Sequence, residues 1–353
     1  MIATYAIALL GSLALSLLLT PFVIKLAPRI GAVDNPSEAV RKLHQKIMPR
    51  AGGIVIALIF VFLSFSLFPG VPTQAYWGAL IASSIVFLIG LLDDIYRLSP
   101  WLKLAGQLVA ASIAVFGFGI GVEVISNPLG QSFDLTKSVV QIASFQVPVF
   151  GVAFSLIWLI GMTNTINFLD GLDGLATGVS GIAALILFLV SVSPKIDQPA
   201  TAVLALILLG ACLGFLRYNF FPAKIFLGDS GAYFLGMMLG SLAIISGAKL
   251  ATALLVLGVP VLDAIWSVVR RLATGRSPFS ADRGHFHYIL VDAGLSQRKT
   301  VLLIYLLALA FGAVALLGDS LQKLIALGVL AVLIAVLMVL FTARRRRKDT
   351  ASK

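Results

Sequence analysis

The chain has 353 residues, a formal net charge of +11 and 59% hydrophobic residues, whereas only 12% of its residues are charged. Soluble domains are about 25% charged, so this chain cannot cover a globular surface with polar groups, and the same composition excludes a disordered chain. A large positive charge is also typical of nucleic-acid binding, but so apolar a chain argues against a nucleic acid as partner. The composition therefore predicts a protein whose main solvent is membrane lipid.

Eleven apolar runs follow one another along the chain. A helix that crosses a bilayer needs about 20 mostly apolar residues. In chain order the runs are 1–24, 51–74, 75–92, 104–122, 138–169, 174–194, 198–216, 230–248, 250–269, 300–318 and 324–343. The fifth run is long enough for one helix and a lead-in, and only the ninth contains an acid, Asp263, close to Pro260. We therefore predict an all-α polytopic membrane protein with about eleven transmembrane helices.

The positions of the basic residues predict how the chain is oriented. All but four of the 26 Lys and Arg residues fall in loops on one side of the predicted spans. Lys and Arg are retained on the cytoplasmic side, so we expect the N-terminus outside and the C-terminus in the cytoplasm. The four outer bases are Lys137, Lys195, Lys249 and Lys323.

The loops indicate one membrane domain and little else. We expect a single transmembrane domain over residues 1–343, followed by a basic cytoplasmic tail over 344–353. The longest outer loop, near 120–147, holds two short candidate strands, 122–125 and 132–135, on either side of an Asn-Pro-Leu-Gly sequence. This pattern predicts a short β-hairpin on the outer side of the membrane.

Two adjacent acids, Asp93 and Asp94, lie at the cytoplasmic end of the third run. Adjacent carboxylates repel each other, and the C-terminus of a helix is the negative end of its dipole. The two acids are either solvated at the interface or form a pair that binds magnesium or accepts a proton. Lys103 opens the next run from the same side, where it could face a phosphate.

A second polar segment places Asn164, Asn167, Asp170 and Asp173 three residues apart. On a helix this spacing gives one polar stripe. Oxygen ligands with few charges suit Mg²⁺, which keeps several waters and binds substrate phosphates. The alternative is a solvated loop, although a loop has no need of such regular spacing.

The third segment, 217–231, combines Asn219, Phe226 and Asp229. Asp229 or Ser230 stands where the eighth run begins, so an N-cap is the simplest role for either residue. Capping alone does not explain the neighbouring polar and aromatic side chains. Phe226 could pack in the interior or stack on a flat ring.

The last large cytoplasmic loop contains Arg283, His285 and His287. Alternate residues of an extended segment point to the same side, so we expect the two histidines to face one way. A zinc site would need three or four nitrogen or sulfur ligands, and no cysteine lies nearby. An arginine with two histidines fits a cradle for a diphosphate better.

These segments, together with Lys-Leu-His-Gln-Lys-Ile-Met-Pro-Arg-Ala-Gly-Gly at 42–53, resemble the polyprenyl-phosphate N-acetylhexosamine-1-phosphate transferase superfamily, glycosyltransferase family 4. The resemblance runs from about Gly31 to Tyr305, with the segments in the family's order. It is closest to the bacterial undecaprenyl-phosphate GlcNAc-1-phosphate transferases that initiate teichoic acid, O-antigen and enterobacterial common antigen synthesis.

The resemblance implies an enzyme with a cytoplasmic active site in the cytoplasmic (inner) membrane of a bacterium. Its substrates would be a UDP-sugar and undecaprenyl phosphate, its cofactor Mg²⁺ or else Mn²⁺, and its assembly a homodimer. The reaction would transfer an N-acetylhexosamine-1-phosphate to the lipid and release UMP. The lipid-linked product would begin a cell-envelope polysaccharide.

The resemblance also assigns residues. Asp229 and Asn167 match the positions that hold Mg²⁺, and Asp93 or Asp94 matches the proposed base for the lipid phosphate. Lys103 matches a lysine that contacts the diphosphate. The nucleotide- or substrate-binding positions are Lys46, Asn164, Asp170, Asp173, Asn219, Phe226, Arg283, His285 and His287, of which Phe226 would stack on uracil.

Two alternatives remain open. The peptidoglycan branch of the family usually carries three consecutive histidines, and here Phe286 and Tyr288 interrupt the run. UDP-GlcNAc is therefore the expected donor, with UDP-MurNAc-pentapeptide and UDP-GalNAc as alternatives. A secondary transporter is the rival class, because Asp263 beside Pro260 suits a broken helix that binds a coupling ion. The polar clusters, however, lie at one face rather than at the midplane.

Overall fold

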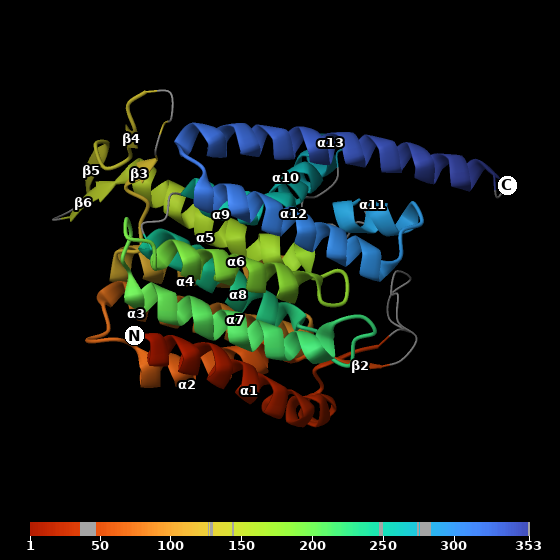
Figure 1. Cartoon of the computed structure of the whole chain (residues 1–353), viewed down its shortest axis with the longest axis horizontal. Coiled ribbons are helices and arrows are strands. Elements are labelled where there is room, and N and C mark those ends of the chain that lie inside the picture. Colours follow the sequence, from red (N-terminus) through yellow and green to blue (C-terminus); the bar gives the residue numbers. More distant parts are fainter. Residues whose placement is uncertain are drawn as a thin grey trace.

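The computed structural model in Figure 1 shows long helices lying side by side along one axis. It describes residues 1–35, 47–125, 127, 130–142, 145–246, 250–273, 275 and 284–351. The strands β3 to β6 gather at one end of the bundle, whereas α11 and β2 lie at the opposite end (Figure 1). We call these the hairpin end and the β2 end.

Helices occupy every one of the predicted apolar runs. They are α1 (Ile2–Leu26), α2 (Gly52–Leu67), α3 (Gln74–Tyr96), α4 (Pro100–Ser112), α5 (Val149–Leu169), α6 (Leu175–Ser191), α7 (Pro199–Asn219), α8 (Gly228–Ile245), α9 (Leu250–Val256), α10 (Gly258–Ala273), α11 (Phe286–Asp292), α12 (Gln297–Leu317) and α13 (Ser320–Ala351). A short 3₁₀ turn, Ala27–Ile30, extends α1, and a π-helical turn, Ile113–Gly117, extends α4.

Within the described residues, eight helical segments are long and apolar enough to cross a membrane. They comprise α1, α3, α4, α5, α7, α8, α12 and the first 22 residues of α13, and α2 and α6 are shorter apolar helices. The protein is therefore a mostly helical, multi-pass membrane protein, as the composition predicts. The count of eleven spans and the orientation stay predictions.

Local sequence signals start several of these helices. The Thr73 hydroxyl accepts a hydrogen bond from the Tyr76 backbone N–H at 3.2 Å, and Ser99 accepts one from Leu102 at 3.3 Å, with Pro100 in the first helical turn. Lipid offers no hydrogen bonds, so backbone groups must be satisfied within the protein, and such caps serve the exposed N–H groups at helix starts.

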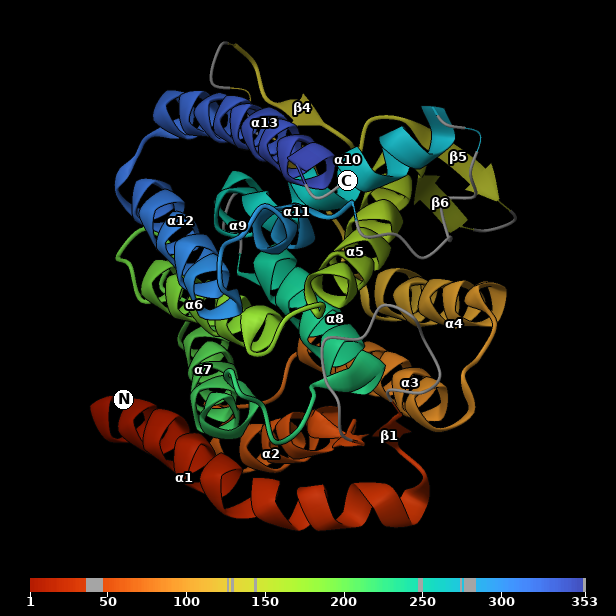
Figure 2. The same cartoon turned by 90° about the vertical axis from the view of Figure 1, so that its right-hand side faces the viewer.

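Helix α8 forms the centre of the bundle, as the end-on view in Figure 2 shows. All of its residues from 228 to 243 are buried. It packs closely on α3, where a Cβ added to Gly90 would lie 2.6 Å from the backbone carbonyl of Asp229. This close approach needs a glycine, and it brings the N-terminus of α8 into the middle of the β2 end.

The ninth predicted run is a broken helix. Helix α9 ends at Val256 and α10 begins at Gly258. Pro260 explains the break, because a proline has no N–H for the carbonyl four residues earlier and its ring clashes with that carbonyl. The break places Asp263 in the second turn of α10.

The segment between α4 and α5 contains the predicted hairpin and a second one. Strand β3 (Val124–Ile125) pairs antiparallel with β4 (Phe133–Asp134), which confirms the expected strand pairing. Strands β5 (Val139–Ile142) and β6 (Phe145–Pro148) also pair antiparallel and form the lead-in to α5. The sequence analysis treated this lead-in only as part of an apolar run, although it contains the β-branched residues typical of strands.

A third strand pair lies at the β2 end. Strand β1 (Val33–Asp34) pairs antiparallel with β2 (Met48–Pro49) and so closes the loop between α1 and α2. Lys46, which the family resemblance assigns to the substrate, lies outside the described residues. The pair sets the path of the chain into Arg50 and the start of α2.

Candidate active site

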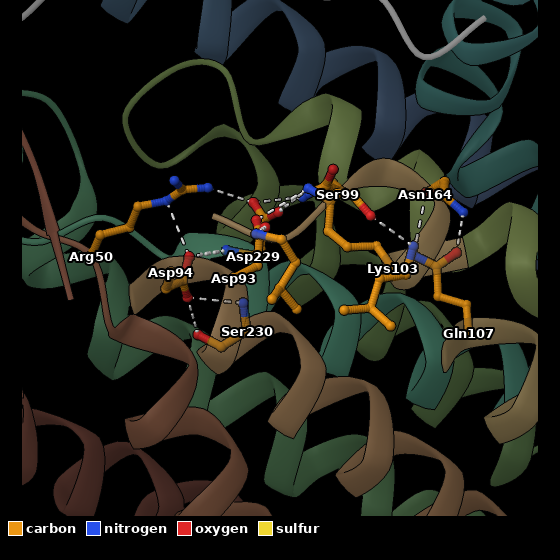
Figure 3. Close-up of polar contacts among 12 residues, drawn as sticks. Arg50, Asp93, Asp94, Ser99, Lys103, Gln107, Asn164, Asp229 and Ser230 are labelled. Atoms are coloured by element: carbon orange, nitrogen blue, oxygen red, sulfur yellow. Dashed lines mark hydrogen bonds and ion pairs between the residues drawn. The ribbon is translucent and has the colours of Figure 1, made fainter. Parts of the chain in front are cut away.

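Four acids and two bases from separate parts of the chain converge at the β2 end of the bundle. They are Asp93 and Asp94 near the end of α3, Asp170 just after α5, Asp229 at the start of α8, Arg50 just before α2, and Lys103 in α4. Figure 3 shows most of this cluster and its ion pairs. We call these six residues the acid cluster.

Asp229 lies at the centre of the acid cluster. One carboxylate oxygen accepts hydrogen bonds from the Arg50 guanidinium at 2.5 Å and from the Asn167 side-chain amide at 3.0 Å. The other oxygen lies 3.2 Å from the Lys103 ammonium. The structure thus brings together Asp229 and Asn167, the two residues that the family resemblance assigns to Mg²⁺.

Lys103 bridges Asp229 and Asp93. Its ammonium nitrogen lies 3.1 Å from the Oδ2 atom of Asp93 (Figure 3). The Oδ1 atom of Asp93 accepts a hydrogen bond from the backbone N–H of Leu98 at 2.8 Å. A lysine in this position neutralises part of the repulsion between two carboxylates, and it lies where a phosphate group of a substrate could displace one of them.

Asp94 is bonded far more completely than Asp93. Its Oδ1 atom accepts from Arg50 Nε at 3.1 Å and from the backbone N–H of Asp229 at 2.8 Å. Its Oδ2 atom accepts from the Ser230 hydroxyl at 2.6 Å and from the Ser230 N–H at 3.1 Å. Its side chain is 0% exposed. Asp94 therefore caps the N-terminus of α8 from a neighbouring helix.

The turn before α8 accommodates this cap through a glycine. Gly228 has a φ of +77°, a left-handed conformation that favours glycine. A Cβ there would also lie 2.6 Å from the Asp94 carboxylate. A glycine at position 228 is therefore required for Asp94 to reach the backbone at the start of α8.

Asp170 is a buried acid close to two other carboxylates of the acid cluster. The backbone N–H of Gly228 donates a hydrogen bond to the Asp170 carboxylate, and Arg50 lies close by. The pKa of Asp170 is nevertheless raised to about 7. Burial is the largest cause of the raised pKa, and the nearby Asp229 and Asp94 carboxylates add to it. Burial alone would lower the pKa of Arg50, but the surrounding acids outweigh burial and raise it.

The donor set of the acid cluster fits a divalent cation that also binds substrate. Its four carboxylates outnumber its two bases, and Asn167 adds an amide oxygen. No three His, Cys, Asp or Glu side chains among the described residues are arranged to hold a metal ion by themselves. Mg²⁺ commonly takes only one or two carboxylates from the protein and fills its other positions with water and phosphate oxygens.

Arg50 reaches the acid cluster because two chain segments run side by side. The backbone N–H of Phe226 donates to the carbonyl of Pro49 at 2.8 Å, and the N–H of Gly53 donates to Leu227 at 3.0 Å. Arg50 and Phe226 form a parallel β-bridge in this pairing. The sequence motif at 42–53 includes Arg50 without predicting a role for it. The adjacent glycines, Gly52 and Gly53, were the available signal of a close backbone contact.

Asn219 and Asp173 shape the loop that carries Phe226. The Asn219 amide donates to the carbonyl of Ile225 at 2.9 Å and its oxygen accepts from Thr177 at 2.7 Å. The Asp173 carboxylate accepts from the backbone N–H of Ala223 at 2.9 Å. Phe226 is partly exposed. The contacts of these three residues with a nucleotide stay predictions.

Asn164 belongs to α5 and contacts Gln107 of α4. It exchanges side-chain hydrogen bonds with Gln107, at 2.6 Å and 3.4 Å, and donates to the carbonyl of Ile160 at 2.8 Å (Figure 3). The sequence predicted no role for Gln107 or Arg50, although both are polar residues around the site. Each is a single polar residue whose partners are distant in sequence.

The histidine segment differs from the predicted extended strand. His285 is the N-cap of helix α11, and His287 lies in its first turn. The two rings nevertheless stack, with 5.7 Å between their centroids and 13° between their planes. The expectation of an extended segment was wrong, because the helix begins between the two residues. Arg283 lies outside the described residues.

His287 is uncharged at neutral pH in this setting. Burial lowers its pKa to about 4, which the charge of Asp263 only partly offsets. The ring lies beside Gly171, and the hydroxyl of the next residue, Tyr288, donates to the carbonyl of Gly171 at 3.2 Å. The segment thus packs on the turn that follows Asp170.

An apolar cavity of about 320 Å³ lies between α5 and α10. Its walls are almost entirely hydrophobic, and Asn164 is its one amide side chain. Residues that line it from the two helices include Phe154, Trp158, Phe168, Val261, Ile265 and Val268. Two of its lining residues, Asn164 and Phe168, lie on either side of Asn167 in α5, so the cavity adjoins the end of α5 that contacts Asp229.

Comparison with known proteins identifies the family. Residues 76–247 match the model of glycosyl transferase family 4, and this stretch contains Asp93, Lys103, Asn167 and Asp229. A probable undecaprenyl-phosphate N-acetylglucosaminyl 1-phosphate transferase of Bacillus subtilis is 34% identical over 95% of this chain and 90% of its own length. The chain belongs to glycosyl transferase family 4. The protein is therefore a transferase, and not the transporter that Asp263 and Pro260 left open.

Other relatives cover most of the chain. A decaprenyl-phosphate N-acetylglucosaminephosphotransferase of Mycolicibacterium smegmatis is 35% identical over 95% of this chain and 87% of its own length. A phospho-N-acetylmuramoyl-pentapeptide-transferase of Desulforamulus reducens is 33% identical over 87% of this chain and 93% of its own length. Relatives of this glycosyl transferase family 4 protein are thus named for two different sugars.

Proposed function

We propose that the protein transfers GlcNAc-1-phosphate from UDP-GlcNAc to undecaprenyl phosphate in the cytoplasmic membrane, with Mg²⁺ as cofactor and UMP as second product. The observation that carries the proposal is the acid cluster beside the apolar cavity. The acid cluster suits a cation with a nucleotide diphosphate, and the apolar cavity suits a hydrocarbon chain. The lipid-linked product begins a cell-envelope polysaccharide.

In the proposed reaction, an oxygen of the lipid phosphate attacks the β-phosphorus of the UDP-sugar. The new bond joins that oxygen to phosphorus, and the bond between the two phosphates of UDP breaks to release UMP. Phosphoryl transfer depends mainly on positioning and on neutralisation of charge. Lys103 and Arg50, on opposite sides of Asp229, supply fixed positive charge at this place.

Asp93, rather than Asp94, suits the role of proton acceptor. Both oxygens of Asp94 are bonded to the start of α8, and one also to Arg50, whereas Asp93 is bonded to one backbone N–H, to Lys103 and to the neighbouring carboxyl group of Asp229. The last proton of a phosphate group has a pKa of about 6, so a weak base is sufficient. In this proposal Asp94 is a positioning residue that holds Asp229.

Asp229 and the side-chain oxygen of Asn167 would hold the cation, with Asp93 next to them. When bound, Mg²⁺ would neutralise the phosphate charges of the donor. The surplus of acids over bases in the acid cluster supports this assignment. The same donor set would accept Mn²⁺.

The apolar cavity between α5 and α10 is the proposed site for the first part of the polyprenyl chain. Its hydrophobic walls suit a hydrocarbon, and it adjoins the end of α5 that carries Asn167. A chain bound there would bring its phosphate group toward Asp93 and Lys103. The polyprenyl-phosphate relatives support this choice of acceptor.

UDP-GlcNAc is the proposed donor because Phe286 and Tyr288 separate the histidines of the last loop. Two of the relatives reported above are named for N-acetylglucosamine, which supports the same sugar. The relative named for N-acetylmuramoyl-pentapeptide keeps the second candidate open. Tyr288 already binds the backbone of Gly171, so its hydroxyl is committed to the protein.

The proposal is tested with the purified full-length protein in lipid vesicles that contain undecaprenyl phosphate. UDP-GlcNAc, UDP-GalNAc and UDP-MurNAc-pentapeptide are offered separately, and labelled lipid and released UMP are measured with Mg²⁺ and with a chelator. We expect equal amounts of both products from UDP-GlcNAc, and neither with the chelator. A clear preference for UDP-MurNAc-pentapeptide would contradict the sugar, and UMP release without labelled lipid would contradict the acceptor.

A further inference from the structure

Asp263 has no role in the acid cluster, yet it is one of the most completely buried acids in the described part of the chain. It is 3% exposed and lies in the second turn of α10. A buried carboxylate costs free energy unless it is paired or hydrogen-bonded. Both of its oxygens are bonded, and both bonds go to the start of α11.

One oxygen of Asp263 lies 3.0 Å from His285 Nδ1, and the other accepts from the backbone N–H of Phe286 at 2.7 Å. Phe286 is the first residue of α11, so its backbone N–H has no hydrogen-bond acceptor within its own helix. A single side chain of α10 therefore fixes both the backbone and the ring of the histidine segment.

The contact of the second ring nitrogen of His285 determines which of its two nitrogens carries the proton. His285 Nε2 lies 3.3 Å from the Nη2 atom of Arg271, in the last turn of α10. A guanidinium can only donate hydrogen bonds, so this contact needs the lone pair of Nε2. The proton of the neutral ring is then on Nδ1 and points at Asp263. Asp263, His285 and Arg271 form one buried chain of hydrogen bonds.

This chain of hydrogen bonds reaches the active site through α5. Arg271 lies over the ring of Phe168 at 5.9 Å, and the His285 ring is 5.6 Å from the same ring. Phe168 directly follows Asn167, which binds Asp229. On its other side His285 stacks on His287. The orientation of His285 therefore determines how the segment packs on the end of α5.

We infer that Asp263 is a positioning residue, which holds His285 in the Nδ1–H tautomer and so orients His285, His287 and Arg271 against the active site. Asp263→Asn keeps the size of the side chain but exchanges donor and acceptor in the hydrogen bond with His285. The new amide accepts from Phe286 with its oxygen and donates to His285 with its nitrogen. The ring proton must then move to Nε2, where it opposes the Arg271 guanidinium.

The first test reads the tautomer directly. The chain has three histidines, so ¹⁵N-histidine NMR of the full-length protein in detergent can resolve them, with His44→Gln and His287→Gln variants for assignment. We expect the His285 proton on Nδ1 in the wild type and on Nε2 in Asp263→Asn. A proton on Nε2 in the wild type, or no change in the variant, would overturn the inference.

The second test reads transfer activity and rests on the proposed function. We expect Asp263→Asn to lower kcat about 100-fold and to change KM for UDP-GlcNAc less than about threefold, since orientation rather than a substrate contact is lost. The double variant Asp263→Asn with His285→Gln should be no slower than His285→Gln alone, because both changes break the same chain of bonds. If the loss of kcat in the double variant equals the product of the two single-variant losses, Asp263 does not act through His285.

Two measurements keep the outcomes distinct. Thermal unfolding in detergent shows whether Asp263→Asn is folded, and Asp319→Asn, at an acid that accepts from the backbone of Gln322 within its own turn, serves as control. A wild type without transfer from UDP-GlcNAc would contradict the proposed function, whereas the NMR result would still decide the role of Asp263.

Discussion

The acids at the two ends of the bundle are bonded in different ways. At the hairpin end, Asp134 accepts from the backbone and hydroxyl of Thr136, and Asp319 accepts from the backbone of Gln322. At the β2 end, Asp94 accepts from residues 135 and 136 positions away, and Asp229 is paired with a base 179 positions away. Acids of one type thus have local partners at one end and distant partners at the other.

This difference separates turn formation from function. An acid that bonds two or three residues ahead satisfies its own turn, and it can do so in water. An acid buried among other acids is costly, and only ion pairs and hydrogen bonds from several helices keep it charged. The β2 end therefore holds an arrangement that packing alone does not require, which is the expected property of a catalytic site.

Substitution of the central acid should give the largest effect. We expect Asp229→Asn to lower UMP release at least 1,000-fold, about 4 kcal/mol in activation free energy, because the variant loses the charge that Arg50, Lys103 and the cation share. The variant should still elute as a folded protein in detergent. Asp134→Asn, at the hairpin end, is the control and should keep wild-type activity. More than a few per cent of activity in Asp229→Asn would contradict its assigned role.

Lys103→Met sharpens the comparison, because it removes the base between Asp93 and Asp229. Turnover should fall about 100-fold through the loss of a fixed positive charge near the phosphates. The Mg²⁺ concentration that gives half of the maximal rate should fall too, since no ammonium group then competes for the two carboxylates. Lys195→Met, in an exposed loop at the hairpin end, should change neither value. A higher Mg²⁺ requirement in Lys103→Met would contradict this competition.

The pKa of Asp170 predicts how stability depends on pH in the absence of metal. The folded pKa, about 7, lies above the ordinary aspartate value of 3.8, so the folded protein binds the proton more tightly than the unfolded chain. The resulting stabilisation is complete below the unfolded pKa and is lost as the pH rises through 7. Between about pH 5 and about pH 8 the loss is about 2.5 kcal/mol.

Thermal unfolding in a chelator should therefore show the wild type losing stability over this pH range and Asp170→Asn losing much less. Added Mg²⁺ should reduce the difference, because a cation stabilises the ionised carboxylate. Identical pH profiles of the two proteins would contradict the raised pKa of Asp170.

The smallest effect is expected at the contact between α3 and α8. A Cβ at Gly90 would lie 2.6 Å from backbone atoms of Asp229 and Ser230, which cannot move independently of α8. Gly90→Ala should lower stability by about 2 kcal/mol through overpacking and should reduce activity. Gly328→Ala, in α13 with no atom within 4 Å of the added carbon, is the matched control. Equal unfolding temperatures of the two variants would contradict the tight contact.

Local patterns in the sequence predicted much of this molecule. Apolar runs, proline positions and charge asymmetry depend on neighbouring residues, so the helices and the hairpin of β3 and β4 could be expected from them. The family motifs also predicted that Asp93, Lys103, Asn167 and Asp229 serve one site. The β5–β6 hairpin was harder to predict, because its residues are as apolar as those of a helix.

The tertiary structure alone decided which of two adjacent acids does what. Asp93 and Asp94 are identical in type and context along the chain, and only the position of α8 leaves one acid as a cap and the other beside Lys103. Arg50 and Asp263 likewise gain their partners from segments that are distant in sequence. Composition and spacing determined that the chain is a multi-pass membrane protein and predicted polar clusters at one end of its helices, because those properties are local. The role of each side chain depends on helix packing, which a pattern along the chain does not contain.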